Sequence, residues 1–169
     1  LYTGDEEMLR SKIYPMMKEE ATLYDQIMVY SEQFKRLVSS PTYSPEQGPR
    51  TNGNAYEQEL IWQHYHNTIK AAQILKVDSD RIKKWNETLN QLNPIEIGDS
   101  GQIKEWYNET YLGSMGDKGH RHMSHLLGLY PGDLISVDNK EWMDAAIISL
   151  TDRGDKTTGW GMGQRINAW

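Results

Sequence analysis

The segment from residue 55 to residue 92 constrains the fold most strongly, because two helical hydrophobic patterns follow each other directly. From about 55 to 75, apolar residues recur every three or four positions, which is the spacing of one helix face. In the second pattern, from about 79 to 92, the aligned apolar residues are Ile82, Trp85 and Leu89. Ser79 or Asp78 can cap this second helix. The short connection between the two patterns predicts a helical hairpin.

Further helical patterns flank the hairpin. Thr3 to Glu7 combine a capping residue with acidic residues, as in a first helical turn, and the pattern then runs to about Leu23. Pro15 lies within it and should kink or break the helix. A helix is also predicted from about Lys140 to Leu150, and Thr157 begins a last, truncated element.

The remaining segments indicate long loops. Residues 27–38 are expected to be extended or a short helix, residues 39–49 contain three prolines and form an ordered loop, and residues 95–106 are expected to form a turn or small hairpin. Residues 108–119 are polar and rich in Gly. Helices joined by long loops, with almost no strand pattern, predict an all-α fold.

The composition indicates that part of the core lies elsewhere. Only 37% of the 169 residues are hydrophobic, and the mean hydropathy of -0.76 is polar for a chain that folds alone. The sequence begins at Leu1 without an initiator Met or a signal peptide, and it ends at Trp169 inside the pattern of a helix start. We therefore expect a segment of a longer chain.

Charge and residue usage narrow the partners. The net charge of -6 argues against nucleic acid and anionic membranes, since phosphate binding needs a basic face. No apolar stretch is long enough to span a bilayer, and no phosphate-binding or dinucleotide-binding motif indicates a cofactor. The absence of Cys excludes disulfides and thiolate catalysis. Ten Tyr and six Trp against one Phe suit sugar rings as well as half-buried core edges.

Polar chemistry is concentrated between His120 and His125, where three imidazoles, a guanidinium and a hydroxyl precede an apolar run. If residues 123–129 are helical, His122 and His125 share a face, while His120 and Arg121 project from the turn before it. Two other interpretations stay open. The residues could be hydrogen-bonded structural groups, or the three His residues could ligate zinc, although the charge of Arg121 opposes a dication.

Several motifs, in the same order along nearly the whole chain, resemble the catalytic domain of glycoside hydrolase family 95. They are Thr3-Gly4-Asp5, Tyr14-Pro15, Leu37 to Glu46, Gln58 to Gln63, Ile97-Gly98, Gly101 to Trp106, His120 to Leu126, Leu129 to Gly132, Arg153-Gly154-Asp155 and Thr158-Gly159-Trp160. That family contains bacterial and plant 1,2-α-L-fucosidases. The resemblance implies an (α/α)6 barrel, of which residues 1–169 would be a central portion of one catalytic domain, truncated at both ends.

The resemblance also implies hydrolysis with inversion and assigns the general acid to Glu46. A carboxyl group on a loop stiffened by Pro45 suits this role, because it is held in place and can be partly buried against aromatic residues. The structural alternative is that Glu46 caps the following turn or pairs with Arg50.

The same resemblance places Arg121 and His122 in the sugar pocket, where a guanidinium and a neutral imidazole can hydrogen-bond hydroxyl groups. His120 and Trp160 are assigned to substrate binding with them. The supporting residues form a second set that acts from behind: Ser124, His125 and Glu57. Glu57 is also a weaker candidate for the acid, and it opens a helix where the family usually has Asp.

The family pattern departs from this chain at both ends. Its water-activating Asn pair falls before Leu1 and its Asp after Trp169, so the isolated segment should lack half of the catalytic machinery and be inactive. Residues 161–165 also differ from the usual Ser-x-Ala-Trp-Lys. The expected partners are therefore a glycan substrate and the rest of the parent chain, and we expect an exported bacterial protein, extracellular or periplasmic.

Two other functions stay open at this point. A silent sugar-binding or scaffold protein could use the same helical barrel, and the surplus of Tyr and Trp suits it equally well. An α-L-galactosidase of the same family would differ in its substrate by one hydroxyl group, a difference that one sequence does not reveal.

Overall fold

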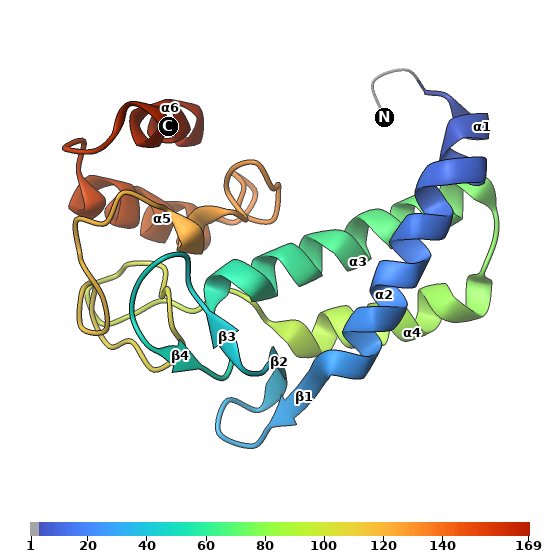
Figure 1. Cartoon of the computed structure of the whole chain (residues 1–169), viewed down its shortest axis with the longest axis horizontal. Coiled ribbons are helices and arrows are strands. Elements are labelled where there is room, and N and C mark those ends of the chain that lie inside the picture. Colours follow the sequence, from blue (N-terminus) through green and yellow to red (C-terminus); the bar gives the residue numbers. More distant parts are fainter. Residues whose placement is uncertain (1–3) are drawn as a thin grey trace.

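The computed structural model describes residues 4–169 (Figure 1). The helices are α1 (Glu6–Met8), α2 (Tyr14–Ile27), α3 (Ala55–Leu75), α4 (Ser79–Leu92), α5 (Lys140–Arg153) and α6 (Gly159–Ala168), with a π-helical segment η1 (Leu9–Ile13) and a 3-10 turn η2 (Ser124–Leu126). The strands are β1 (Met28–Ser31), β2 (Arg36–Ser39), β3 (Thr42–Tyr43) and β4 (Arg50–Thr51). The described part of the chain is therefore mostly helical, as predicted.

The first helical stretch continues past Pro15, where a break or kink was expected. Asp5 caps α1 by accepting the Met8 N–H at 2.9 Å, whereas Thr3 lies outside the described residues. The hydrogen bonds widen to the π pattern over η1, where the Tyr14 N–H donates to the Leu9 carbonyl. Pro15 follows directly on this π-helical segment, so the helix changes its hydrogen-bond pattern next to the proline and does not end there.

The predicted helical hairpin is confirmed, and it consists of α3 and α4. Asn54 caps α3 by accepting the Glu57 N–H at 2.9 Å, and Lys76 ends the helix in the left-handed conformation, with φ 55°. Asp78 precedes α4, but its side chain does not cap the helix. Its carboxylate instead accepts a 2.7 Å hydrogen bond from the Tyr14 hydroxyl, which ties α2 to the hairpin.

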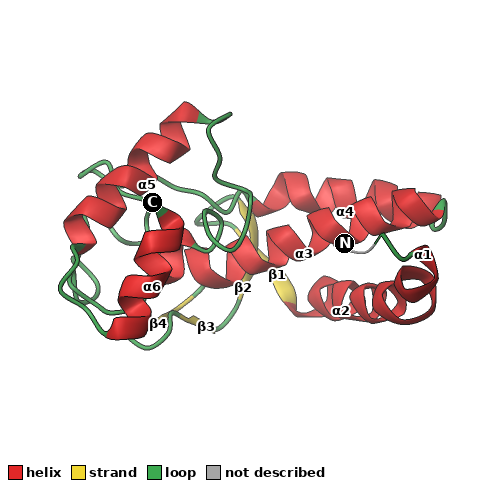
Figure 2. Ribbon diagram, turned by 90° about the horizontal axis from the view of Figure 1, so that it is seen from above, coloured by secondary structure: helices red, strands yellow, loops and turns green. Residues whose placement is uncertain are grey.

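Helix α2 packs across one face of the α3–α4 hairpin, and these three helices form one packed unit, called the helical layer below (Figures 1 and 2). Its core contains Ala21 from α2, Tyr65 and Ala72 from α3, and Trp85 and Leu92 from α4, all at most 1% exposed. The Tyr65 hydroxyl donates to the Ala21 carbonyl at 3.1 Å, so even the polar end of this buried ring is satisfied. Among residues 4–169, no helix has both the length and the apolar character needed to cross a bilayer.

Two small antiparallel sheets make a purely helical description incomplete. β1 pairs with β2 from Met28↔Ser39 to Ser31↔Arg36, so the region left open between strand and helix is a β-hairpin. β3 pairs with β4 inside the proline-rich loop. An isolated bridge between Ile97 and Ile103 matches the small hairpin expected in that region. The complete (α/α)6 barrel and the domain boundaries stay predictions.

The second core lies at the other end of the molecule, around η2 and α5 (Figure 1). Residues 123–129 contain only the 3-10 turn η2, so the helix that was considered as a condition for this run does not form. In an α-helix the Gly128 N–H would donate to the Ser124 carbonyl, but it donates to a Glu59 carboxylate oxygen at 2.8 Å. This bond from α3 holds the segment as a loop.

Candidate active site

Glu46 stands on a tight turn in the loop between β3 and β4. The turn runs from Ser44 to Gln47, whose backbone N–H donates to the Ser44 carbonyl at 3.0 Å. Both flanking side chains are buried, whereas 62% of the Glu46 side chain is exposed. The partial burial expected for Glu46 is therefore absent, because the turn directs its own polar flanks inward and the carboxylate outward.

The Glu46 carboxylate accepts a hydrogen bond from the guanidinium of Arg121. The fold thus joins two residues that lie 75 positions apart in the sequence. The ion pair that Glu46 forms is with Arg121 and not with the nearby Arg50 considered from the sequence. Because 41% of the Arg121 side chain is also exposed, solvent screens this pair and its contribution to stability is about 0–1 kcal/mol.

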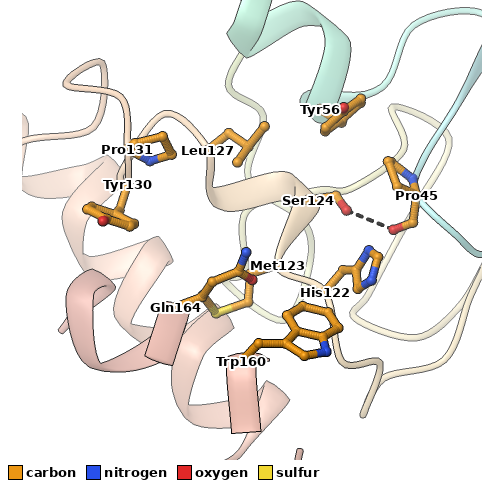
Figure 3. A pocket seen from close by; sticks show the side chains of 10 residues that line it. All are labelled: Pro45, Tyr56, His122, Met123, Ser124, Leu127, Tyr130, Pro131, Trp160 and Gln164. Atoms are coloured by element: carbon orange, nitrogen blue, oxygen red, sulfur yellow. Dashed lines mark hydrogen bonds between the residues drawn. The ribbon is translucent and has the colours of Figure 1, made fainter. Parts of the chain in front are cut away.

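A cavity of about 300 Å³ lies beside this pair (Figure 3). This volume is at the lower end of the range of about 300–1,000 Å³ for small-molecule sites. Its lining residues are Pro45, Tyr56, His122, Met123, Ser124, Leu127, Tyr130, Pro131, Trp160 and Gln164. The cavity therefore joins the Glu46 turn, the N-terminal turn of α3, the His-rich loop and α6.

His122 and Trp160 form one wall of the cavity. Their ring centroids are 5.0 Å apart with an interplanar angle of 71°, an edge-to-face contact. Half of Trp160 is exposed, at 50%. The wall thus offers an imidazole that can hydrogen-bond a hydroxyl next to an indole that can cover an apolar ring face.

Ser124 connects the His-rich loop to the acid turn. Its hydroxyl donates to the Pro45 carbonyl at 2.9 Å, and the Ser124 side chain itself is buried (Figure 3). This bond fixes the backbone directly before Glu46 relative to His122.

His120 lies behind His122, with ring centroids 5.0 Å apart. Burial, followed by the charges of His122 and Arg121, lowers the pKa of His120, so its imidazole is neutral near neutral pH. The Arg121 guanidinium approaches its Nε2 at 3.4 Å and the His122 N–H approaches its Nδ1 at 3.3 Å. A neutral imidazole has one acceptor nitrogen, so only one of these contacts is a hydrogen bond at any moment.

His125 does not share a face with His122, because the helix on which that arrangement depended does not form. Its side chain is fully buried, and Arg153 donates to its Nδ1 at 3.2 Å. Burial and then the charge of Arg153 lower the pKa of His125 well below its ordinary value. The ring is therefore neutral, and its 3.7 Å approach to Glu105 is not an ion pair. The cause is that η2 begins only at Ser124, and Met123 before it has the non-helical angles φ -117° and ψ 53°, so His122 and His125 do not belong to one helical turn.

Two further interpretations from the sequence concern Glu57, as a weaker candidate for the acid, and the three His residues, as zinc ligands. Glu57 lies in the first turn of α3, where the Tyr43 N–H approaches its carboxylate at 3.5 Å, and it does not line the cavity. Within the described residues, no group of three or more His, Asp or Glu side chains is arranged to hold a metal ion. His125 points instead at the guanidinium of Arg153.

A buried polar network supports the site and was not predicted. The Glu105 carboxylate, 2% exposed, accepts hydrogen bonds from Ser44, from Gln47 and from Arg153. The only signal for it in the sequence was that Glu105 and Arg153 each fall within a motif of the family resemblance, which gave neither of them a role.

Arg165 is a second residue that sequence reasoning missed. Its buried guanidinium donates to the carbonyl groups of Gly154 at 2.8 Å, Arg121 at 3.3 Å and His120 at 3.4 Å. Helix α6 thereby holds the backbone from which His120 and Arg121 project, even though residues 161–165 depart from the expected motif.

Comparison with known proteins agrees with the motifs. The family model described as "Glycosyl hydrolase family 95 catalytic domain" matches residues 1–169. A protein named "Probable alpha-fucosidase A" from Aspergillus niger is 33% identical over 99% of this chain and 23% of its own length. Its namesake from Aspergillus oryzae is 40% identical over 70% of this chain and 17% of its own length.

A plant protein extends the comparison. The protein named "Alpha-L-fucosidase 2" from Arabidopsis thaliana is 27% identical over 99% of this chain and 21% of its own length. The chain thus spans less than a quarter of the length of these relatives. They come from fungi and a plant, so the bacterial source stays a prediction, as does export. Because the family model covers every residue, the chain belongs to the glycosyl hydrolase family 95 catalytic domain.

Proposed function

We propose that the catalytic domain containing this chain hydrolyses terminal 1,2-linked α-L-fucosides with inversion, and that Glu46 is its general acid. The observation that carries the proposal is the meeting of Glu46 and Arg121 next to a cavity lined by His122 and Trp160. The α-fucosidase names of the relatives support the sugar. The linkage and the inversion rest on the family resemblance.

In the proposed reaction the Glu46 carboxylic acid gives its proton to the glycosidic oxygen as the bond from that oxygen to the anomeric carbon breaks. A water molecule attacks the anomeric carbon from the opposite face, and a base takes the proton of this water. The resulting Glu46 carboxylate regains a proton from solvent, which its exposure allows. We expect the base and the water-activating residues in other parts of the parent chain.

The remaining site residues would bind the sugar. Arg121 can donate to neighbouring hydroxyl groups in a fork once substrate loosens its contact with Glu46, and neutral His120 supports the loop behind it. His122 can bond a hydroxyl, and Trp160 can cover the apolar face of the ring. Ser124 and His125 act from behind, and Glu57 stays an expected supporting residue in the first turn of α3.

The test uses the full-length protein and a 2′-fucosylated trisaccharide, with the anomer of the released sugar followed by NMR. Glu46→Gln keeps the size of the side chain but removes the acid, so we expect kcat to fall about 10²–10⁴-fold. Glu32→Gln is the matched control, because Glu32 is 81% exposed and pairs with Lys35 at the β1–β2 turn. Unchanged turnover in Glu46→Gln would remove Glu46 as the acid, and release of the retained anomer would overturn inversion.

A further inference from the structure

The Glu105 carboxylate holds both ends of the turn that carries Glu46. One carboxylate oxygen, Oε1, accepts the Ser44 hydroxyl, and the other, Oε2, accepts the Gln47 amide at 3.0 Å. Ser44 is fully buried and Gln47 is 9% exposed, so water does not compete effectively for these bonds. Ser44 and Gln47, which flank Pro45-Glu46, are therefore both held by the Glu105 carboxylate, which is called the anchor below.

The anchor is itself fixed from the opposite side. Arg153 donates to Glu105 Oε2 at 2.9 Å, and its other terminal nitrogen donates to the Asp117 carbonyl at 2.9 Å. The Asp117 N–H donates back to the Gln47 side-chain oxygen at 2.7 Å. Glu105, Arg153, Asp117 and Gln47 thus close a ring of hydrogen bonds around a buried carboxylate.

The same ring reaches the sugar-facing loop. Arg153 donates to His125 Nδ1 at 3.2 Å, and His125 directly follows Ser124, which lines the cavity together with His122 on the same loop. An arginine cannot accept a hydrogen bond, so His125 Nδ1 must be the acceptor and the ring proton lies on Nε2. Glu105 therefore sets the place of the acid turn relative to the His-rich loop through a chain of directed bonds.

We propose that Glu105 is a positioning residue for the general acid, which it acts on through Ser44 and Gln47 without touching the substrate. This inference rests on the proposed function, since it assumes that Glu46 delivers a proton. Loss of the Glu105 carboxylate releases the Glu46 turn by a distance that matters for proton transfer, while the cavity that binds the sugar keeps its walls.

The test separates proton delivery from all other steps by changing the leaving group. A 2′-fucosylated trisaccharide needs a proton on its leaving oxygen, whereas fluoride leaves from α-L-fucosyl fluoride without one. In full-length protein, we expect Glu105→Gln to lower kcat on the trisaccharide about 100-fold with little change in KM, because a misplacement of about 1 Å has an effect of this order. We expect kcat on the fluoride to fall less than about 10-fold.

A matched control distinguishes positioning from general loss of structure. Glu96 forms partly buried ion pairs with Arg36 and Lys104 and does not line the cavity, so Glu96→Gln weakens comparable interactions and should lower both rates by the same small factor. Ser44→Ala removes a single bond to Glu105 and should give a smaller loss that is again confined to the trisaccharide. This variant carries the test if Glu105→Gln does not fold.

The outcomes are separable. If the Glu105 and Ser44 variants lose equal activity on both substrates, or lose none on either, the positioning role is overturned. The proposed function would still stand if Glu46→Gln is impaired on the trisaccharide alone. Normal turnover by Glu46→Gln on the trisaccharide would overturn the proposed function, and the positioning role with it.

Discussion

The helical layer and the site region are stabilised by different kinds of interaction. In the layer of α2, α3 and α4, most of the deeply buried side chains are apolar or aromatic, such as Tyr65, Trp85 and Leu92. In the site region, charged and amide groups are buried equally deeply, among them Glu105, Arg153 and Gln102. Apolar packing is non-directional and tolerates small shifts, whereas a hydrogen-bonded network holds each partner at one place. The site therefore has positional precision that the layer does not need.

Unsatisfied polar groups follow the same division. Among the described residues, buried side-chain atoms without a hydrogen-bond partner occur at Ser39, Thr42, Asn54, Glu59, Gln102, Trp106, His125, Arg153 and Thr157. None of them lies in α2 or α4, and the two in or next to α3 are at its end nearest the site. Concentration of such groups in one region is typical of functional sites, where local rules of stability are relaxed.

The largest expected losses of stability come from removing a buried aromatic side chain in the helical layer and a buried cation in the site region. Trp85→Ala should lower the free energy of unfolding by about 3–5 kcal/mol through the lost apolar contacts and the cavity. Arg153→Met should cost a similar amount, about 3–5 kcal/mol, because it leaves the Glu105 carboxylate buried without its cation. Urea unfolding of both variants measures the two losses.

A double variant shows whether the second loss is electrostatic. Glu105→Gln combined with Arg153→Met removes both charges, so its cost should be smaller than the sum of the single costs by about 0.5–3 kcal/mol. Strict additivity would contradict the view that the network, and not packing alone, holds the site region.

Two glycines with the same φ of +69° test how tightly the site region is packed. A Cβ on Gly48 would lie 2.3 Å from the Trp106 ring, whereas a Cβ on Gly154 would meet nothing within 4 Å. Both Ala variants should lose about 1–3 kcal/mol from the unfavourable backbone conformation. Gly48→Ala should lose about 1–3 kcal/mol more from overpacking. Equal melting temperatures would show that Trp106 can move aside.

The sequence predicted the helical layer well because its information is local. The spacing of Ile82, Trp85 and Leu89 alone defines α4, and its predicted bounds agree with the structure. The site region depends on distant pairs: Glu105 meets Ser44 across 61 positions and Arg153 across 48. No periodicity encodes such pairs, and the meeting of Glu46 with Arg121 was expected only from the family resemblance.

The errors have the same origin. The helix considered for residues 123–129 does not form, because a carboxyl group from α3 accepts the Gly128 N–H and prevents the α-helical bond. The β1–β2 hairpin was left open because strands of four residues carry too little alternation to be distinguished from a short helix. Glu46 was expected to be partly buried, but it is exposed. Its exposure is set by the inward direction of the Ser44 and Gln47 side chains, which depends on their distant partner Glu105.

Helix α3 belongs to both regions, and its buried Glu59 gives the smallest of the expected effects, a pH dependence of stability. Its C-terminal half is buried through Ala72 and Leu75, whereas its N-terminal half buries Glu59 with one carboxylate oxygen lacking a partner among the described residues. Burial raises the pKa of Glu59 well above its ordinary value of 4.5, against the opposing effect of hydrogen bonds from the Gly128 and Leu127 backbone. Glu59 is therefore protonated in the folded chain over a pH range in which the unfolded chain has lost that proton.

The sign of the pH effect follows from this difference. Below the ordinary value of 4.5, both states carry the proton and Glu59 contributes no pH dependence. As the pH rises above it, the unfolded state loses the proton first, so the free energy of unfolding falls by up to about 1.4 kcal/mol per pH unit until the raised pKa is passed. Glu59→Gln keeps the bond to Gly128 but cannot ionise, so the variant should gain stability relative to the parent as the pH rises. Urea unfolding between pH 4 and pH 8 would show curves that diverge, and parallel curves would mean that the buried end of α3 tolerates the charge.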